Sequence, residues 1–195
     1  MESKQKNELD FWKWLYSTKD DYLEFRKQDA KEKMKHFDIS NRNGIGIDVG
    51  CGLISVFNGL SNRVVAIDPL LEGYNEIIKH EVDNIRYIEA SGEDIPFKEG
   101  YFDYAFCVNV IDHTPNPKKM ADEIKRVVRK GGNIYFEVNF DDVLSPCHYE
   151  LWNKEKVKEM FGDLKLIKEV EERNEKDKQT LYHAIYENIC VNSNL

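Results

Sequence analysis

The chain has 195 residues, of which 41% are hydrophobic and 33% are charged, a length and composition typical of one folded domain with a single core. Its formal net charge of −8 disfavours nucleic acid as a partner, because phosphate backbones would be repelled. No run approaches the roughly 18 apolar residues that a membrane span needs, and the polar start from Met1 to Asp10 has no signal-peptide core, so we expect a cytoplasmic protein without a membrane partner.

The first stretch of the chain, residues 1–40, has a helical pattern and is rich in aromatic side chains. These are Phe11, Trp12, Trp14, Tyr16, Tyr22 and Phe25. An aromatic stripe at helical spacing usually packs a helix onto the core, and this is the simplest interpretation here.

A short apolar run over residues 45–49 leads into a turn that carries an acid and two glycines, Asp48-Val49-Gly50-Cys51-Gly52. The run predicts a buried strand, and the glycines let the backbone turn sharply and approach a ligand. A dinucleotide site would need a third glycine at the position of Ser55, and the charge of Asp48 would repel a diphosphate. The same charge would attract the ammonium group of an amino-acid-like cofactor, which points to S-adenosylmethionine.

Beyond this turn, short β-rich runs alternate with helical ones, a pattern that predicts a parallel sheet with helices on both faces. The expected strands span residues 45–49, 63–68, 85–89, 103–109, 133–140, 164–171 and 180–188, and the expected helices span 53–60, 72–80, 117–129 and 153–160. Ligands of such sheets bind at the carboxyl ends of the strands. Asp68, Asn109, Asp112 and His113 fall at such ends or in the loops that follow them.

Several blocks, in this order along the chain, resemble the class I S-adenosylmethionine-dependent methyltransferases of the common small-molecule, type 11-like group. The matching blocks span residues 48–52, 68–69, 91–97, 111–117 and 124–132. The resemblance implies an α/β, Rossmann-like, doubly wound fold with a seven-stranded sheet, mostly parallel, whose last strand is antiparallel and inserted between the two strands before it. It also implies transfer of a methyl group from S-adenosylmethionine to a small-molecule acceptor by in-line displacement.

The resemblance implies a cofactor site in the loops that follow the first four strands. Its residues are Asp48, Gly50, Cys51, Gly52, Asp68, Pro69, Gly92, Glu93, Asp94 and Asn109. Asp68 would accept hydrogen bonds from both ribose hydroxyls, since a carboxylate can form a strong bidentate pair. Asp48 would attract the amino group of the cofactor, residues 92–94 would form the adenine loop, and Asn109 would lie beneath the methyl group.

The chemistry of the acceptor decides whether a base is needed, because only an acceptor such as a hydroxyl has a proton to lose. His113 is the candidate base, with Asp112 beside it, and His148 ranks below it. A loop histidine without a catalytic role is the alternative.

No metal is expected from the sequence. Asp141, Asp142 and His148 match no ligand spacing of zinc or calcium sites. The four cysteines, at positions 51, 107, 147 and 190, show no Cys-x-x-Cys spacing, and we expect free thiols without structural zinc.

These observations predict a single methyltransferase domain over residues 1–195. Residues 41–140 would form the cofactor-binding core and residues 141–195 the C-terminal part of the sheet. In the family, N-terminal helices often cover the cofactor, so a helical lid is the second interpretation of residues 1–40.

Two other function classes stay open. One is a methyltransferase-like protein that binds the cofactor, or has lost it, and serves as a regulatory or assembly partner. The other is an NAD-dependent oxidoreductase, which Asp48 and the missing third glycine disfavour. The identity of the acceptor and the oligomeric state cannot be inferred from the sequence.

Overall fold

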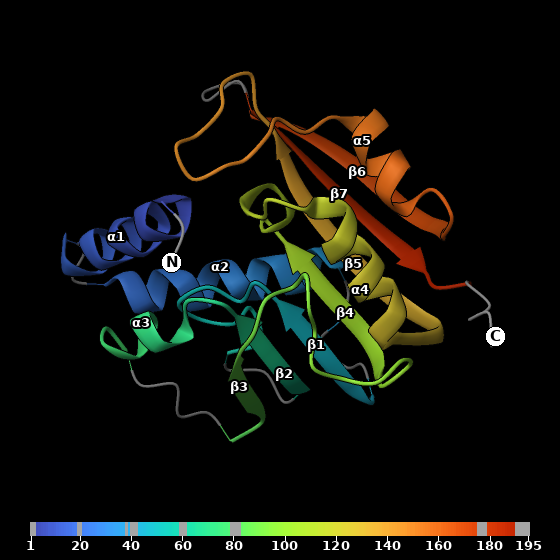
Figure 1. Ribbon diagram of the computed structural model, residues 1–195, viewed down its shortest axis with the longest axis horizontal. Helices are drawn as coiled ribbons and strands as arrows, with labels where there is room; N and C mark the ends of the chain where they lie inside the picture. The colour runs from blue at the N-terminus through green and yellow to red at the C-terminus, as the bar shows by residue number, and fades with distance from the viewer. Residues whose placement is uncertain are drawn as a thin grey trace.

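A seven-stranded sheet organises the chain, in the strand order β3-β2-β1-β4-β5-β7-β6 (Figure 1). The computed structural model describes residues 3–18, 21–37, 39, 43–58, 62–78, 83–174 and 179–189. The strands are β1 (Ile45–Val49), β2 (Arg63–Asp68), β3 (Ile85–Glu89), β4 (Phe102–Val108), β5 (Val128–Phe140), β6 (Lys165–Asn174) and β7 (Gln179–Glu187).

The first five strands run parallel, and β7 pairs antiparallel with both β5 and β6. The predicted insertion of the last strand between its two predecessors is therefore confirmed. The strand order reverses beside β1, because β2 and β3 lie on one side of it and β4 and β5 on the other. Such a reversal is where open α/β sheets bind ligands, outside the carboxyl ends of the strands.

Helices cover both faces of the sheet, as the alternation of strands and helices predicted (Figure 1). On one face lie α1 (Ser3–Thr18), α2 (Tyr22–Phe37) and α3 (Leu71–Asn75), and on the other lie α4 (Pro117–Val127) and α5 (Lys154–Phe161). None of the described helices is long and apolar enough to cross a membrane.

The start of α4 shows how local sequence sets an element boundary. Pro117 occupies the first turn, and the side chain of Asn116 accepts a hydrogen bond from the backbone N–H of Lys119 at 3.2 Å. The buried residues of this helix are Met120, Ala121, Ile124 and Val127, which form one apolar stripe against the sheet. The helix therefore lies beside the carboxyl end of β4, where the candidate site is built.

The helix predicted over residues 53–60 was wrong for the residues that the structure describes. Residues 53–58 form turns, and positions 59 and 60 lie outside the described residues. The reason is local: the carboxylate of Asp48 accepts hydrogen bonds from the Ser55 hydroxyl and from the Val56 backbone N–H, at 2.6 and 3.2 Å. These bonds turn the chain and compete with a helical ladder.

The helix predicted over residues 72–80 is also shorter than expected. It is the five-residue α3, which ends at Asn75 and is followed by a turn; positions 79 and 80 lie outside the described residues. Gly73 lies in its middle, and glycine is a poor helix former. A side chain there would also meet Leu9 of α1, because an added Cβ would lie 2.8 Å from the Leu9 Cδ2 atom.

The aromatic N-terminal stretch divides between core and surface. Tyr22 and Phe37 are buried, and the Phe37 ring packs edge-on against Phe106, with ring centroids 5.5 Å apart. Trp14 and Phe25 are each 59% exposed. Packing onto the core, the simplest interpretation of this stretch, therefore holds for only part of it.

We predict that Phe37→Ala destabilises the fold far more than Phe25→Ala on the same helix. Losing a buried phenylalanine costs about 3–5 kcal/mol, whereas an exposed one changes stability by about 0.5 kcal/mol or less. Urea unfolding followed by circular dichroism measures both free energies. Equal losses in the two variants would contradict the packing described here.

Candidate functional site

A cavity of about 530 Å³ opens at the carboxyl ends of β1, β2 and β4. Its size lies within the range of about 300–1,000 Å³ that is common for small-molecule sites. The sequence-predicted residues that line it are Asp48, Gly50, Cys51, Gly52, Asp68, Pro69, Gly92, Glu93, Asn109, Asp112 and His113. Asp94 is exposed and does not line it.

The glycine turn after β1 has a backbone that only glycine adopts easily. Gly50 and Gly52 have positive φ angles of 67° and 60°. The backbone N–H groups of Gly50 and Cys51 both donate to the Ile67 carbonyl, at 2.8 and 3.0 Å, which ties the turn to β2. A Cβ on Gly50 would lie 1.9 Å from the Cγ2 atom of Val110. The turn therefore fits tightly between its neighbouring loops.

Asp48 is buried at the base of the cavity and organises the turn that follows. Its carboxylate accepts from Ser55 and Val56, as described above. Ser55 occupies the position where a dinucleotide fingerprint would have its third glycine. Its hydroxyl donates a hydrogen bond to the buried carboxylate of Asp48.

Asp68 joins two loops at the end of β2. Its Oδ2 atom accepts from the Gly52 backbone N–H and its Oδ1 atom from the Leu70 backbone N–H, both at 2.9 Å. Each carboxylate oxygen can accept a second hydrogen bond, so the group can still receive a ligand hydroxyl. Burial raises the pKa of Asp68 to about 6; the two N–H donors act to lower it, and the charges of Glu8 and Asp48 raise it further.

The loop after β3 closes another side of the cavity. Gly92 packs closely there, since an added Cβ would lie within 3 Å of Met120 and of Val49. The Glu93 carboxylate accepts a hydrogen bond from the Thr114 hydroxyl, which links this loop to the one after β4. Glu93 is therefore part of the cavity wall, whereas its neighbour Asp94 faces solvent.

Asn109 directly follows β4 and has a strained backbone conformation. It is the one residue other than glycine with a positive φ, 50°, among the described residues. Its side-chain oxygen Oδ1 is buried and has no hydrogen-bond partner in the described part of the chain. Backbone strain and an unpaired polar atom both cost free energy, and both are found preferentially at functional sites.

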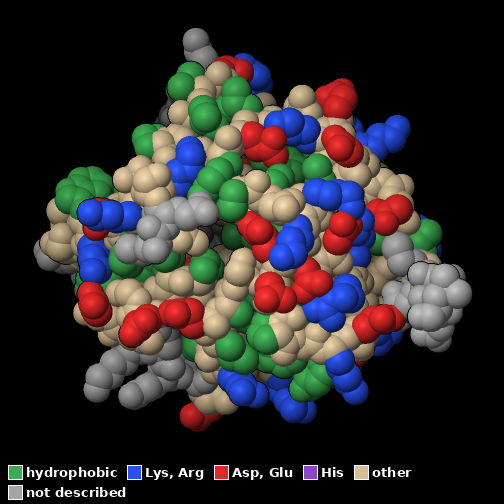
Figure 2. Space-filling model, viewed as in Figure 1, with side chains coloured by type: hydrophobic (Ala, Val, Ile, Leu, Met, Phe, Trp, Pro, Cys, Tyr) green, Lys and Arg blue, Asp and Glu red, His purple; other side chains and the backbone are tan. Residues whose placement is uncertain are grey.

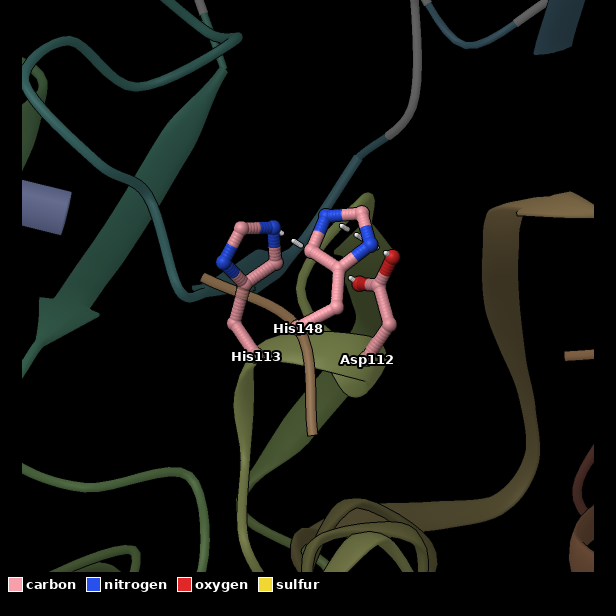
Figure 3. Close-up of side chains that lie close together, drawn as sticks. All are labelled: Asp112, His113 and His148. Atoms are coloured by element: carbon pink, nitrogen blue, oxygen red, sulfur yellow. Dashed lines mark ion pairs between the residues drawn. The ribbon is translucent and has the colours of Figure 1, made fainter. Parts of the chain in front are cut away.

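The far end of the cavity holds Asp112 and His113, in the short 3₁₀ turn after β4, and His148, in the loop after β5 (Figure 3). The ring centroids of the two histidines are 4.5 Å apart. One side-chain atom from each of the three residues lies within 4.8 Å of the others. The sequence analysis ranked His148 below His113 as a base and found no metal-ligand spacing for it, because nothing along the chain indicates that its loop folds back beside residue 113.

Glu8 of α1 is a cavity residue that the sequence analysis missed. Its Oε2 atom lies 3.2 Å from the His113 Nδ1 atom, and its Oε1 atom accepts from the Trp12 indole at 2.6 Å. Burial by itself lowers the pKa of His113, but the hydrogen bond and charge of Glu8 hold it above its usual value. Burial likewise tends to raise the pKa of Glu8, yet His113 keeps it below its usual value. The two groups thus favour each other's charged forms.

A signal for Glu8 does exist in the sequence. The α1 residues that line the cavity are Lys4, Gln5, Glu8, Phe11 and Trp12, which share one helical face. Reading the aromatic residues together with the polar ones at helical spacing would have placed Glu8 on that face.

Comparison with known proteins agrees with this architecture. Residues 47–136 match the family model of the methyltransferase domain. The matched segment covers slightly less than half of the chain, and over this segment the chain is similar to methyltransferase domains. It is similar to an uncharacterized protein of Methanocaldococcus jannaschii, with 34% identity over 114 residues, 54% of this chain and 55% of that protein. It is also similar to the tRNA U34 carboxymethyltransferase of Campylobacter curvus, with 29% identity over 103 residues, 49% of this chain and 35% of that enzyme.

Solved structures of methyltransferases share the fold. The 1,6-didemethyltoxoflavin N1-methyltransferase of Burkholderia thailandensis, solved with its substrate and S-adenosylhomocysteine, superposes with a TM-score of 0.67 at 14% identity, over 96% of this chain and 91% of that one. The chain spans about half the length of the first curated relative and about a third of the second. The fold is thus shared over nearly the whole chain, whereas sequence similarity to the curated relatives covers about half of it.

We predict that Gly50→Ala destabilises the fold more than Gly52→Ala. Both variants put a side chain on a left-handed backbone, which costs about 1–2 kcal/mol. Only the alanine at position 50 also collides with Val110, because no atom lies within 4 Å of a Cβ at Gly52.

Thermal and urea unfolding measure the difference. Adding Val110→Ala to Gly50→Ala removes the nearest colliding atom and is expected to recover part of the lost stability. If Gly52→Ala is as damaging as Gly50→Ala, the close approach of Val110 is not what constrains the turn.

Proposed function

We propose that this chain binds S-adenosylmethionine in the cavity and transfers its methyl group to a small-molecule acceptor. The observation that carries the proposal is the position of Asp68, a buried carboxylate that holds the glycine turn at Gly52 and still has accepting capacity toward the cavity. A ribose with two adjacent hydroxyls fits such an acceptor. The membership of residues 47–136 in the methyltransferase domain family supports the same cofactor.

The proposed cofactor contacts follow the loops in order. The ribose hydroxyls would donate to Asp68, with Pro69 beside it, and the negative charge of Asp48 would attract the amino group. The protein backbone of the turn formed by Gly50, Cys51 and Gly52 would lie directly against the cofactor. The remaining contacts would come from Gly92 and Glu93 toward the adenine and from Asn109 toward the methyl end. Because Asp94 is exposed outside the cavity, we leave it out of this proposed set.

The acceptor would occupy the end of the cavity beside Asp112, His113 and His148. In the reaction, a lone pair of the acceptor forms a bond to the methyl carbon while the carbon–sulfur bond breaks. The electron pair of the carbon–sulfur bond goes to sulfur, which becomes the neutral thioether of S-adenosylhomocysteine. The sulfonium is already a good leaving group, so holding the reactants together in a water-poor pocket supplies much of the acceleration. We propose that His113, with Asp112 beside it, removes any proton that the acceptor loses.

A small acceptor is favoured over a nucleic acid by charge. The net charge is −8, and acidic and basic side chains are interspersed over α4 and α5 on the face seen in Figure 2, without a continuous basic area. Phosphate backbones bind to clustered Lys and Arg. The Campylobacter relative is named for a tRNA, so tRNA belongs in any acceptor screen. The screen measures release of S-adenosylhomocysteine. If tRNA supports turnover and no small molecule does, the small-molecule proposal is overturned.

We further propose that α1 acts as a lid. Glu8 and Trp12 line the cavity, while Leu9 of the same helix is buried in the core. A helix that is anchored on one face and lines the cavity with the other can exclude water from a bound cofactor and acceptor.

Asp68→Ala is predicted to weaken S-adenosylhomocysteine binding by about 30- to 150-fold, since the loss of a charge-assisted acceptor costs about 2–3 kcal/mol. Isothermal titration measures the affinity. Asp94→Ala, which removes an exposed carboxylate outside the cavity, serves as the control and is expected to bind normally. Unchanged affinity in Asp68→Ala would reject this residue as the ribose ligand, and binding of NAD instead of S-adenosylhomocysteine would favour an oxidoreductase.

Cofactor affinity should also depend on pH through Asp68. Its pKa of about 6 means that the carboxylate is ionised above this pH and protonated below it. The ionised form is the better acceptor, so affinity is expected to be full above pH 6 and to fall by up to about tenfold for each pH unit below it. Titrations of the wild type and of Asp68→Asn between pH 5 and 8 test this. The variant should lose this part of the pH dependence, and a profile identical to that of the wild type would contradict the assignment.

The lid proposal predicts a local change in hydrogen exchange. Binding of S-adenosylhomocysteine should slow amide exchange in α1, because the helix gains contacts with the ligand. Exchange in α5, which contributes no residue to the cavity lining, is the internal control. Equal effects in both helices would indicate general stabilisation and no lid.

A further inference from the structure

The imidazole rings of His113 and His148 each direct their Nε2 atom toward Asp112 (Figure 3). The His113 Nε2 atom lies 3.8 Å from Asp112 Oδ1, and the His148 Nε2 atom lies 3.5 Å from Asp112 Oδ2. Both separations are too long for good hydrogen bonds. Two ligands of one zinc ion, each about 2.0–2.2 Å from it in a tetrahedron, lie about 3.3–3.6 Å apart. The His148 separation falls in this range and the His113 separation is slightly longer, so small side-chain shifts would bring the three groups onto a common ion.

The other nitrogen of each ring faces a second carboxylate. The His113 Nδ1 atom lies 3.2 Å from Glu8 Oε2, and the His148 Nδ1 atom lies 3.8 Å from Asp141 Oδ2. Histidines that bind metals almost always direct their free ring N–H to a carboxylate, a carbonyl or water, which fixes the ring and leaves the opposite nitrogen as the ligand. His113 shows this arrangement, whereas the Asp141 carboxylate lies near His148 Nδ1 but beyond hydrogen-bond distance; in both rings Nε2 is the atom nearest Asp112.

Asp112 supplies an independent indication. Its side chain is almost fully buried, and its Oδ1 atom has no hydrogen-bond partner among the residues that the structure describes. A buried carboxylate oxygen without a donor is costly, and a cation beside it would remove that cost.

We propose that Asp112, His113 and His148 bind one divalent transition-metal ion, of the zinc class, at the acceptor end of the cavity. Two imidazoles and one carboxylate suit such an ion and leave coordination positions open. Because all three residues line the cavity, the open positions face the space for the acceptor. The sequence analysis expected no metal, since Asp112 and His113 come from one loop and His148 from another.

The role of the ion toward the acceptor rests on the proposed methyl transfer, whereas binding of the ion does not. An acceptor hydroxyl bound to the ion would lose its proton to solvent more readily, because a divalent cation stabilises the resulting oxyanion. The oxyanion would then take the methyl group from sulfur. His113 and Asp112 would act on the acceptor proton through the ion, as its ligands.

Metal binding is tested on the untagged full-length chain by competing for Zn²⁺ with a chromogenic chelator. Co²⁺ serves as a visible-absorption probe of the coordination. We expect one tightly bound equivalent in the wild type. His148→Ala and Asp112→Asn should each weaken binding by more than about 100-fold, and Glu8→Gln, which alters only the partner of a ligand, by about 10- to 100-fold.

Asp142→Asn is the matched control, because this exposed carboxylate lies in the same loop region as His148 and outside the cavity lining. It should bind Zn²⁺ like the wild type. Titration with S-adenosylhomocysteine shows whether each variant keeps an intact cofactor half. Two results would overturn the metal site. One is that the wild type binds Zn²⁺ no more tightly than His148→Ala does. The other is that the wild type prefers Mg²⁺ and that His148→Ala binds Mg²⁺ equally well. Zn²⁺ binding without S-adenosylhomocysteine binding would instead keep the metal site and reject the proposed function.

Discussion

The hydrogen bonds of the Asp68 carboxylate hold the candidate site together. One oxygen accepts from Gly52, in the turn after β1, and the other accepts from Leu70, in the loop that leads to α3. Since the backbone N–H groups of Gly50 and Cys51 also donate to the Ile67 carbonyl near the end of β2, the turn after β1 is fixed to β2 through its backbone as well. The buried charge is a cost that these donors reduce without removing, because the pKa of Asp68 still lies at about 6.

α1 extends this arrangement to the opening of the cavity. Its Leu9 side chain packs over Gly73 of α3, the helix that follows Asp68, and its Lys13 forms an ion pair of 2.7 Å with Glu76 just beyond α3. The exposed ion pair adds little stability, so the apolar contact is the main attachment. The same helix reaches His113 through Glu8. The same helix therefore contacts both the loop after β2 and the end of the cavity that holds His113.

Much of the fold could be predicted because apolar periodicity and glycine turns are local signals. The alternation of strands and helices gave the sheet, and the family resemblance gave the antiparallel insertion of β7. The helix predicted at residues 53–58 does not form, for a physical reason that apolar periodicity does not show. The buried carboxylate of Asp48 accepts a hydrogen bond from the Val56 backbone N–H. The cavity residues after β1, β2 and β4 could be predicted because they directly follow strands. The cluster around His148 was not, because it depends on how a long loop and α1 return to the sheet, and such contacts leave no spacing in the sequence.

The charges around the cavity suggest why a cationic ligand would suit it. The carboxylates of Glu8, Asp48, Asp68 and Asp112 all line the same space. The charges of Glu8 and Asp48 already raise the pKa of Asp68, so they disfavour its ionised form. A sulfonium and an ammonium group would relieve that repulsion, and a metal ion would do so at the acceptor end. In the proposed reaction the sulfonium becomes a neutral thioether, so one of the two positive charges that favour binding disappears as the product forms. The same carboxylates that draw the cofactor in would then hold its product less strongly, which favours its exchange for a new cofactor molecule.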